Sequence, residues 1–432
     1  MNPTMSVTEN TGSSKVMHDT EEKPPRAFLV GIRDSKTKKA EAESLSKELL
    51  SLSGTLGLDA VAQETVNIRE KHPQYGMGTG KAAEIAGKAA EVQADCIVFD
   101  REITPSQQRN WEKLCDIPVI DRQELILQIF AGRAKTREAA LQINLAELYY
   151  SLPRLHHKYI DLNRQRGGRY GTKGSGETKL ETDRRLVEQR IHKLEEELEE
   201  LRLQRDVRRR QRDKAGVPVC ALAGYTNAGK SSLLNKLTDA GVLAEDKLFA
   251  TLDSTSRRLE LPGGLNCLLV DTVGFIRRLP HSLVSAFRST LEEVASADLV
   301  IHVVDVSDPD VQPQYETTLS VLDDLGAGSI PRITVLNKSD LPSFFTEEMK
   351  ERLDALPISA IDGRGIPELL SRMDDLLSGS VAEFRIPLAR SDLAAMLHRN
   401  GTVISEKYGD EFIEIKARTD EKTAGRLREF KV

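Results

Sequence analysis

The pattern of apolar and polar positions over residues 26–125 predicts a small α/β domain. Short apolar runs such as "AFLVGI", "CIVFD" and "IPVID" have the length of buried strands. Between them, residues 36–52 place leucines at helical spacing, and "GKAAEIAGKAAEVQA" is rich in the strong helix former alanine. Strands that alternate with helices in this way pair mainly in parallel, so we expect a largely parallel sheet.

Residues 126–152 are fully helical in pattern, and residues 126–214 together are expected to form a helical hairpin with a basic, glycine-rich tip. Two series of apolar residues recur at spacings of four and three, first Leu141, Leu145, Leu148 and Leu152, then Val187, Ile191, Leu194, Leu198 and Leu201. A connecting segment separates the two series, and each series is too short to be stable alone. They are best buried against each other, which predicts an antiparallel helical hairpin.

The rest of the chain returns to α/β patterning. Residues 215–378 alternate strands with helices, as a mixed, mostly parallel sheet does, and residues 379–432 contain the strands and helices of a small α/β domain. Residues 1–25 have no apolar run and are expected to be a disordered tail. The predicted fold class is therefore α/β, with the main domain preceded by a small α/β domain and a helical hairpin.

Composition narrows the class of protein. The chain has 432 residues, 39% hydrophobic and 30% charged, with a net charge of −6, which favours a multidomain globular protein and argues against a protein that coats nucleic acid. The N-terminus has no signal-peptide core, and no apolar run reaches membrane-spanning length. We expect a cytoplasmic protein with no integral membrane segment. It should be a monomer, because the hairpin seams are used internally.

The four cysteines lie in or beside apolar runs without any CxxC pair, which favours buried, reduced thiols over disulfides or a metal site; they are Cys96, Cys115, Cys220 and Cys267.

The connecting segment of the hairpin is basic and rich in glycine. Residues 154–179 carry seven basic and two acidic residues, a local charge of +5 in an acidic chain. Most charged loops are simply solvated, but long loops without secondary structure are usually functional or disordered, and glycines let the backbone approach a surface closely. A tyrosine in the loop could stack on an unpaired base. We therefore expect contact with RNA, with the candidates Arg164, Arg166, Gly167, Gly168, Arg169, Tyr170 and Lys173. For the second basic run, residues 202–214, RNA contact and a solvated helix end are equally good interpretations.

The stretch "VPVCALAGYTNAGKSSLLNKL" has the spacing of a phosphate-binding loop between a strand and a helix. Its glycines allow backbone N–H groups to converge on phosphate oxygens at a helix N-terminus. Lys230 should reach the β- and γ-phosphates, and the hydroxyl of Ser231 should hold Mg²⁺. The expected phosphate-binding residues are Gly224, Tyr225, Thr226, Asn227, Ala228, Gly229, Lys230, Ser231 and Ser232. The weaker match "GMGTGK" at residues 76–81 is better interpreted as a turn before a helix.

A second strand end lies forty-one residues after Lys230, where "LNCLLVDTVG" ends in Asp271 and Gly274. The carboxylate is placed to hold Mg²⁺ through water, and the glycine N–H can reach the γ-phosphate. In the intervening "LFATLDSTSRRL", Thr251 is the candidate for a hydroxyl that closes onto Mg²⁺, and Thr255 is its rival. The expected switch residues are Phe249, Ala250, Thr251, Leu252, Asp253, Asp271, Thr272, Val273, Gly274 and Phe275, and the expected catalytic residues are Lys230, Thr251 and Gly274.

The third strand end, "ITVLNKSD", selects the base. A carboxylate at Asp340 can accept from both N1–H and N2–H of guanine, and adenine lacks this donor pair, so it would leave the acid unpaired. "LPISAIDGRGI" follows, with backbone that can reach the guanine O6. The expected guanine-binding residues are Asn337, Lys338, Asp340, Ser359 and Ala360. These elements, in this order, predict a GTP site.

At this point the chain resembles a known family. Residues 217–378 resemble the TrmE–Era–Obg group of P-loop GTPases. The upstream "GTKGSGETKLETDRR", with "RAKTREAALQINLAEL" and "LPRL" before it, is similar to the HflX family of ribosome-associated GTPases. The resemblance covers nearly everything from about residue 26 onward. It implies a GTPase that binds the large (50S) ribosomal subunit and its rRNA, places its N-terminal domain and hairpin tip near the peptidyl-transferase centre, and splits stalled or stressed ribosomes. Hydrolysis of GTP would then reset the protein for recycling.

Two residues bear on turnover. Phe275 stands where many GTPases carry a glutamine that orients the attacking water, which predicts slow turnover alone and stimulation by the ribosome. The resemblance makes Asn227 a candidate ligand of K⁺, with a loop-stabilising amide as the alternative. It also implies that the C-terminal domain contacts the large subunit near the stalk.

Two other classes of function stay open at this point. The first is a nucleotide-gated RNA-binding factor in large-subunit assembly, for which hydrolysis is incidental and splitting is not the task. The second is a P-loop ATPase or kinase, which the residues 337–340 and the lack of kinase loops disfavour. The resemblance links some family members to ATP through the N-terminal domain, and only "GMGTGK" supports that here.

Overall fold

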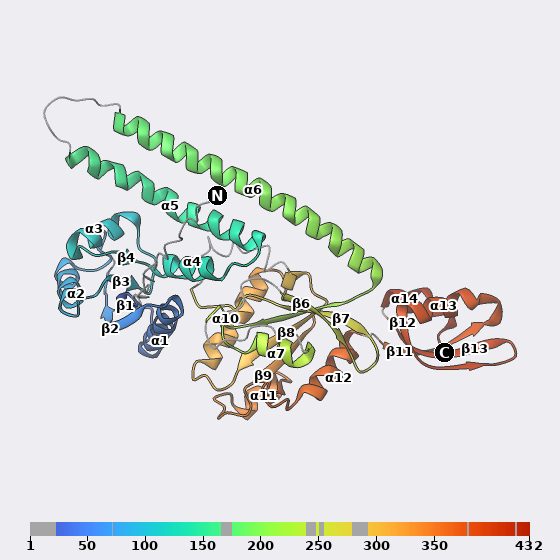
Figure 1. Cartoon of the computed structure of the whole chain (residues 1–432). Helices are drawn as coiled ribbons and strands as arrows, with labels where there is room; N and C mark the ends of the chain where they lie inside the picture. The colour runs from blue at the N-terminus through green and yellow to red at the C-terminus, as the bar shows by residue number, and fades with distance from the viewer. Residues whose placement is uncertain are drawn as a thin grey trace, which may run out of the picture.

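The computed structural model describes residues 23–70, 72–165, 175–238, 248–249, 255–278, 293–377, 380–419 and 421–432. Within them, side chains are described on 23–155 and from 181 onward, apart from a few further positions. Four parts follow one another along the chain: a parallel sheet, a long helical hairpin, a mixed sheet and a small antiparallel sheet (Figure 1). This arrangement confirms the predicted fold class.

The N-terminal sheet has the order β2-β1-β3-β4 with all pairs parallel. Its strands are β1 (Arg26–Arg33), β2 (Asp59–Asn67), β3 (Cys96–Phe99) and β4 (Val119–Ile120), and its helices are α1 (Lys39–Leu56), α2 (Thr79–Glu91), α3 (Pro105–Cys115) and α4 (Arg122–Arg133). Apolar residues fill both faces, as expected of parallel strands covered by helices. The buried Trp111 closes one face, and its Nε1 donates to the carbonyl of Tyr75 at 3.0 Å.

The segment "GMGTGK" is the turn before α2. Gly76 has a φ of 75°, and Gly78 is the N-cap residue of the helix. The Lys81 ammonium pairs with Glu64 and Glu84, each at 2.8 Å. This lysine neutralises two carboxylates of its own domain, which agrees with the turn rather than with a phosphate loop.

The helical region begins earlier than predicted and is interrupted. α4 starts at Arg122 and packs on α1, inside the core of the N-terminal sheet. The chain leaves helical geometry at residues 134–136, and the Thr136 hydroxyl then accepts from the N–H of Ala139 at 3.1 Å, which begins a new helix. The prediction of one continuous helix from residue 126 was wrong for this reason.

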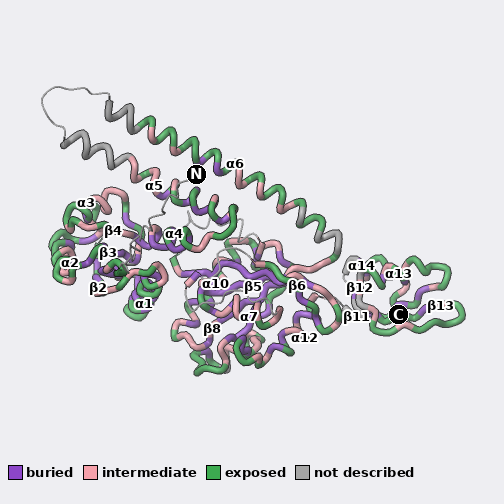
Figure 2. The backbone as a smooth tube through the Cα atoms, in the orientation of Figure 1, coloured by how far each residue is buried: buried purple, intermediate pink, exposed green. Residues whose placement is uncertain are grey.

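The hairpin consists of α5 (Arg137–Gln165) and α6 (Ser175–Ala215), which lie side by side and extend beyond the rest of the molecule (Figure 1). Its seam matches the predicted one except for Leu201, and the cluster contains Leu141, Leu145, Leu148, Leu152, Val187, Ile191, Leu194 and Leu198. The outward faces of both helices are largely exposed (Figure 2). The predicted RNA-contacting residues from Arg166 to Lys173 lie outside the described residues, and Arg164 lies in α5 with no described side chain.

The central sheet has the order β10-β9-β8-β5-β7-β6, parallel except for the edge strand β6. Its strands are β5 (Val219–Gly224), β6 (Thr255–Glu260), β7 (Asn266–Asp271), β8 (Leu299–Asp305), β9 (Arg332–Asn337) and β10 (Leu356–Pro357). The helices described around it are α7 (Lys230–Thr238), α10 (Val311–Asp324), α11 (Glu347–Arg352) and α12 (Ile366–Leu377). The carboxyl ends of the parallel strands meet at one edge, where open α/β sheets bind ligands.

The C-terminal sheet has the order β11-β13-β12 and is antiparallel. It consists of β11 (Ser380–Pro387), β12 (Gly401–Tyr408) and β13 (Phe412–Thr419), with α13 (Ser391–Asn400), α14 (Glu421–Arg426) and the 3-10 turns Leu388–Arg390 and Arg428–Phe430. A separate core of buried residues, Phe384, Leu397 and Ile415 among them, holds it together. It lies at the opposite end of the central sheet from the N-terminal sheet (Figure 1).

Two general expectations can be compared with the structure. All four cysteines are free, and three are buried; Cys115 is half-buried. Among the residues that the structure describes, no helix combines the length and apolar character needed to span a bilayer.

Candidate nucleotide site

The loop between β5 and α7 requires glycine at two positions. A Cβ on Gly224 would lie 2.3 Å from the carbonyl oxygen of Val303, and a Cβ on Gly229 would lie 2.2 Å from Asn337 Nδ2. Gly229 also has a φ of 91°, which an L side chain rarely adopts. The strand, loop and helix predicted from the sequence are therefore present, and side chains are excluded where the loop touches its neighbours.

Lys230 lies at the centre of this loop. Its buried ammonium donates to the carbonyls of Gly224 at 3.1 Å and Tyr225 at 2.8 Å. Burial lowers the pKa of Lys230 to about 8, and the nearby carboxylate of Asp271 opposes part of that shift. A buried cation held by two loop carbonyls has the charge and the position to interact with an anion above the loop.

The end of β7 lies against the start of α7. Ser231 Oγ donates to Asp271 Oδ2 at 2.6 Å, and the buried Thr272 hydroxyl donates to the carbonyl of Leu222 at 2.6 Å. A Cβ on Gly274 would lie 2.8 Å from the Cα of Thr226 and 3.0 Å from Lys230 Nζ. The structure thus brings together the two predicted Mg²⁺ ligands of this region and the glycine predicted to reach a γ-phosphate.

The side chain of Phe275 has a structural role. It is 1% exposed and packs in an apolar cluster with Ala221, Val294 and Leu322. Its backbone pairs with the phosphate loop: the N–H donates to the carbonyl of Gly224 at 3.1 Å, and the carbonyl accepts from Thr226 N at 2.8 Å. A side chain fixed in the core cannot orient a water molecule, as the sequence predicted.

The strand end at β9 connects two loops. Asn337 Nδ2 donates to the carbonyl of Ala228 at 2.9 Å, and Asn337 Oδ1 accepts from the N–H of Ala360 at 3.0 Å. Asn337 is therefore a brace between the phosphate loop and the loop after β10, a role that the sequence did not reveal. Lys338 has a φ of 63° and pairs with Asp305 at 2.6 Å.

The other predicted guanine-binding residues lie close by. Asp340 is exposed on the surface, where a ligand can reach its carboxylate. Ser359 and Ala360 are buried, and Ser359 Oγ accepts from the N–H of Asp362 at 3.3 Å. Ser339 N donates to the carbonyl of Ile358 at 3.1 Å, which holds the two loops together.

The structure describes only some of the remaining predicted residues. Ala250, Thr251, Leu252 and Asp253 lie outside the described residues. Thr255, the rival hydroxyl, is the first residue of β6 and pairs with Asp271 across the sheet. Asn227 is exposed, with a φ of 62°. Phe249, predicted as a switch residue, is buried against Phe130 of α4, with ring centroids 4.6 Å apart.

Behind the site, a polar network joins the central sheet to the N-terminal sheet. The Tyr225 hydroxyl contacts the Glu48 carboxylate of α1 and accepts from the N–H of Arg277 at 2.9 Å. Arg277 Nε lies 3.3 Å from the same carboxylate. We call this set the interdomain polar network; its members are Ser44, Glu48, Arg122, Tyr225, Arg277 and Asp310.

Sequence analysis missed most of this network. The one available signal was weak: in "SLSKELLSL", Glu48 lies at helical spacing from Leu45 and Leu52, on the face of α1 that is buried. A charged residue on a helix is usually exposed, so its burial depends on a partner that the local sequence does not show.

The sheet order, the loop around Lys230 and the clustered strand ends define a P-loop GTPase. The comparisons agree with this class. Residues 219–338 match the family described as "50S ribosome-binding GTPase", residues 43–131 match "GTP-binding GTPase N-terminal", and residues 133–212 match "GTP-binding GTPase Middle Region".

The chain belongs to the HflX family of GTPases. The GTPase HflX of Akkermansia muciniphila is 46% identical over 417 residues, covering 91% of this chain and 95% of the relative. The GTPase HflX of Escherichia coli is 43% identical over 376 residues, covering 86% and 87%. A GTP-binding protein of Sulfolobus solfataricus, solved with GDP, covers 82% of this chain and 99% of its own at 22% identity and a TM-score of 0.44. The family assignment rests on the sequence relatives, and it identifies GTP hydrolysis as the reaction of this protein.

Proposed function

We propose that this GTPase binds the large ribosomal subunit and splits stalled or stressed ribosomes, and that GTP hydrolysis resets it. The observation that carries the proposal is the attachment of a GTPase to a hairpin of two long helices whose tip, residues 154–179, has a charge of +5. Binding to rRNA phosphates requires such a concentration of positive charge, and glycines would let the backbone come close to the RNA. The family description of residues 219–338 as a ribosome-binding GTPase supports the same partner.

The nucleotide roles of the site residues are part of this proposal. Lys230 would bind the β- and γ-phosphates, and the N–H of Gly274 would bind the γ-phosphate. Asp340 would accept the two guanine N–H groups, while Asn337 holds the loops on which the base and phosphates rest. The roles of the remaining predicted phosphate-binding and switch residues, including Thr251 as a catalytic hydroxyl, belong to the same proposal.

The donors around Asp271 fit a magnesium ion. Ser231 Oγ and Asp271 Oδ2 are hard oxygen ligands 2.6 Å apart, next to a lysine that would share the phosphates. Mg²⁺ bound there would offset charge on the β- and γ-phosphates. Asn227 is proposed as a ligand of K⁺, and equal turnover in potassium and sodium buffers would exclude that role.

The proposed ribosomal partner also sets the expected location of the protein. We expect the protein to act as a monomer in the cytoplasm, where large subunits are present. The candidate residues between Arg164 and Lys173 would contact the rRNA. The small C-terminal domain would contact the subunit elsewhere.

GTP turnover by the purified protein, alone and with large subunits, tests the proposal. We expect slow turnover alone and strong stimulation by subunits. A variant with Arg166, Arg169 and Lys173 changed to alanine should lose the stimulation. A matched variant with the exposed Lys36, Lys38 and Lys39 changed to alanine removes the same charge elsewhere and should keep it.

Sedimentation of whole ribosomes distinguishes splitting from assembly. Dissociation into subunits with GTP, but not with GDP, is the expected result. Stimulated turnover without dissociation would favour the assembly factor that binds RNA under nucleotide control. Turnover that large subunits leave unchanged would contradict both, and point to another RNA or protein as the partner.

A further inference from the structure

Two consecutive residues at the start of α4 face different parts of the molecule. Asp121 is fully buried and faces α5, where its Oδ2 pairs with Arg154 Nη2 at 3.1 Å. Arg122 is also buried and faces the segment after β7, where its Nη2 donates to the carbonyl of Arg277 at 2.9 Å. One rigid turn of helix therefore contacts both the hairpin and the segment that begins at Gly274.

The contacts on the nucleotide side are costly to break because they are buried. Arg122 Nη2 also pairs with Glu48, whose second oxygen contacts Tyr225 and Arg277. Arg277 Nη2 donates to Ser44 Oγ at 2.5 Å. A buried charge that loses its partner is strongly destabilising, so these groups must move together or stay in place.

Gly274 connects this network to the phosphates. It lies three residues before Arg277, and its own position is fixed against Thr226 and Lys230. The backbone between them is short, with the bonds of Phe275 to the phosphate loop in the middle. A displacement of Gly274 on binding a γ-phosphate would therefore change the position of the Arg277 carbonyl, which Arg122 holds.

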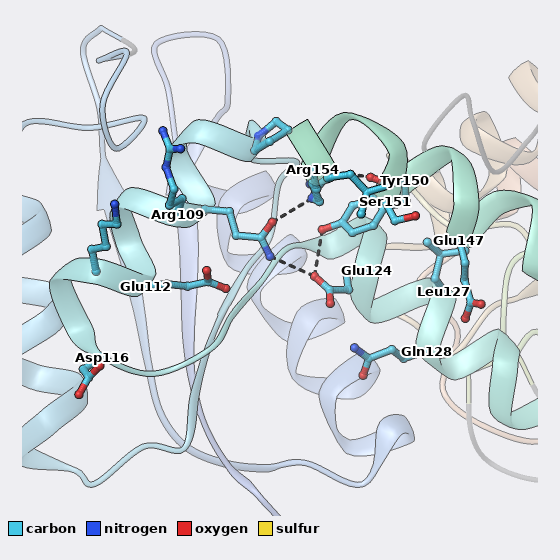
Figure 3. Close-up of a pocket in the computed structure, with 14 residues that line it drawn as sticks. Arg109, Glu112, Asp116, Glu124, Leu127, Gln128, Glu147, Tyr150, Ser151 and Arg154 are labelled. Carbon is cyan, nitrogen blue, oxygen red and sulfur yellow. Dashed lines mark hydrogen bonds between the residues drawn. The ribbon is translucent and has the colours of Figure 1, made fainter. Parts of the chain in front are cut away.

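The contacts on the hairpin side fix α5 by polar bonds. The Tyr150 hydroxyl donates to Glu124 Oε2 at 2.9 Å and also lies 3.2 Å from Asp121 Oδ1. The Arg154 guanidinium lies 3.4 Å from the Tyr150 ring centroid and also donates to the carbonyl of Ile103 at 3.1 Å. Figure 3 shows Tyr150, Arg154 and Glu124 turned toward one another from α5 and α4.

A hollow of about 780 Å³ lies beside these bonds, lined by residues of α3, α4 and α5 (Figure 3). Side chains do not fill this space. On this side α5 is held against α3 and α4 by the bonds of Arg154 and Tyr150, while Ala139, Ile143 and Ala146 of α5 pack in the apolar core of the N-terminal sheet.

We propose that Glu48 and Arg122 are positioning residues for GTP hydrolysis, and that the step from Arg122 to Asp121 transmits the position of residues 273–278 to the hairpin. Glu48 and Arg122 hold the backbone that carries Gly274, without touching the nucleotide themselves. Because coupling between two sites is reciprocal, a partner that fixes the hairpin alters GTP affinity by the same factor as GTP alters affinity for that partner. The identity of that partner as a ribosome rests on the proposed function; the coupling within the chain does not.

Hydrogen exchange of the full-length protein tests the coupling without any ribosome. The amides of residues 122–155 are compared with GDP and with a non-hydrolysable GTP analogue bound. In the wild type, exchange in α4 and the first half of α5 should differ between the two nucleotides. In Glu48→Gln, which keeps the shape but removes the charge, that difference should vanish while the difference in the phosphate loop remains.

The control is Glu197→Gln. Glu197 pairs with Arg137 at 3.0 Å on the surface of the hairpin, outside the network, so the wild-type difference should persist. If Glu48→Gln does not fold, the double variant Glu48→Met, Arg122→Met removes both charges and keeps the core filled. It should fold and show the same loss of coupling.

Kinetics separate a positioning role from a purely structural one. Glu48→Gln should lower kcat by about 5-fold or more, while the affinity for GDP changes less than about 2-fold. Arg122→Lys, which keeps the charge near Glu48, should retain more activity than Arg122→Met.

Two results would overturn the inference: a wild type whose α4 and α5 exchange alike with both nucleotides, or a Glu48→Gln variant that keeps the difference and the full kcat. If the coupling is present but large subunits leave turnover unchanged, the inference stands and the proposed ribosomal function fails.

Discussion

The segment from Val273 to Arg278 has two sides that are built in different ways. At Gly274 it touches the phosphate loop, through backbone and a missing side chain. On its other side it touches the N-terminal domain, through buried charged pairs at Arg277 and through Val273 and Ile276, which pack in the apolar core of that domain. The nucleotide side depends on the shape of the backbone, and the other side depends on paired charges within an apolar contact.

This difference determines how far the contributing residues lie apart in the chain. The phosphate loop is one run of nine residues, from Gly224 to Ser232, so its geometry is local. The interdomain polar network joins residues as distant as Ser44 and Asp310, which are 266 positions apart. Local geometry tolerates no added atom, whereas a dispersed network tolerates changes that preserve its charges.

The largest effect should come from adding one carbon to the nucleotide side. In Gly229→Ala, the new Cβ would lie 2.2 Å from Asn337 Nδ2 at a φ of 91°, so the loop must deform. We expect GDP affinity to fall by about 100-fold or more, which is a loss of about 3 kcal/mol of binding free energy. Titration with a fluorescently labelled GDP measures it.

Gly264→Ala is the matched control. Gly264 has a φ of 82°, yet nothing lies within 4 Å of the added carbon. This variant should lose about 1 kcal/mol of stability and bind GDP normally. Equal losses of affinity in both variants would mean that strain, rather than contact with Asn337, limits the loop.

A smaller loss is expected for Asn337→Ala. It removes the bonds from Asn337 to Ala228 and Ala360, and so disconnects the phosphate loop from the loop after β10. Two buried groups lose their partners at about 1–3 kcal/mol each, and part of this cost should appear in binding. We expect GDP affinity to fall by about 10- to 100-fold in a calorimetric titration. Asn266→Ala, which removes an exposed bond to Arg258, should leave the affinity unchanged.

Tyr225 contributes to both sides of the segment, and Tyr225→Phe removes its contribution to only one of them. The backbone carbonyl of Tyr225 belongs to the phosphate loop, whereas its hydroxyl belongs to the interdomain polar network. We expect a loss of about 1–2 kcal/mol in the free energy of unfolding and lower turnover, with GDP affinity nearly unchanged. Denaturant unfolding and GTP hydrolysis measure the two effects.

Tyr149→Phe is the control, because its hydroxyl bonds to Glu195 on the exposed hairpin. A loss of GDP affinity in Tyr225→Phe as large as the loss in Asn337→Ala would refute the separation of the two sides.

The smallest effect is expected from pH, at a residue that no motif marks. His302 in β8 is buried beside Tyr315, and burial lowers the pKa of its imidazole to about 3. Its neutral form therefore stabilises the fold fully above the unfolded pKa near 6.5, and this stability is lost as pH falls toward 3. Between pH 6.5 and 5.5 we expect a loss of about 1 kcal/mol that His302→Phe should not show in denaturant unfolding. An equal pH dependence in both proteins would assign the loss to other groups.

The parts of the molecule predictable from sequence were those with a short repeat or a fixed spacing. The seam of the hairpin followed from leucines at helical spacing, and the strand ends at Gly224, Asp271 and Asn337 followed from their motifs. The interruption at residues 134–136 was missed, because a threonine that caps a helix looks the same as one within it.

The network behind the site could not be predicted for a physical reason. Glu48 and Arg122 are charged residues on helices, where exposure is the usual outcome. They are buried because each meets the other, together with Arg277, and that meeting exists only once the two sheets pack together. The sequence predicted that Phe275 cannot orient a water molecule, but it did not predict the place of this side chain in the core.

The hairpin is long enough for a small rotation at its base to become a large displacement at its tip. α6 has 41 residues, so at 1.5 Å per residue it is about 60 Å long. A rotation of only about 5° at its base would displace the far end by about 5 Å. If the tip binds RNA as proposed, an adjustment too small to disturb the sheet would change which part of the RNA the tip meets.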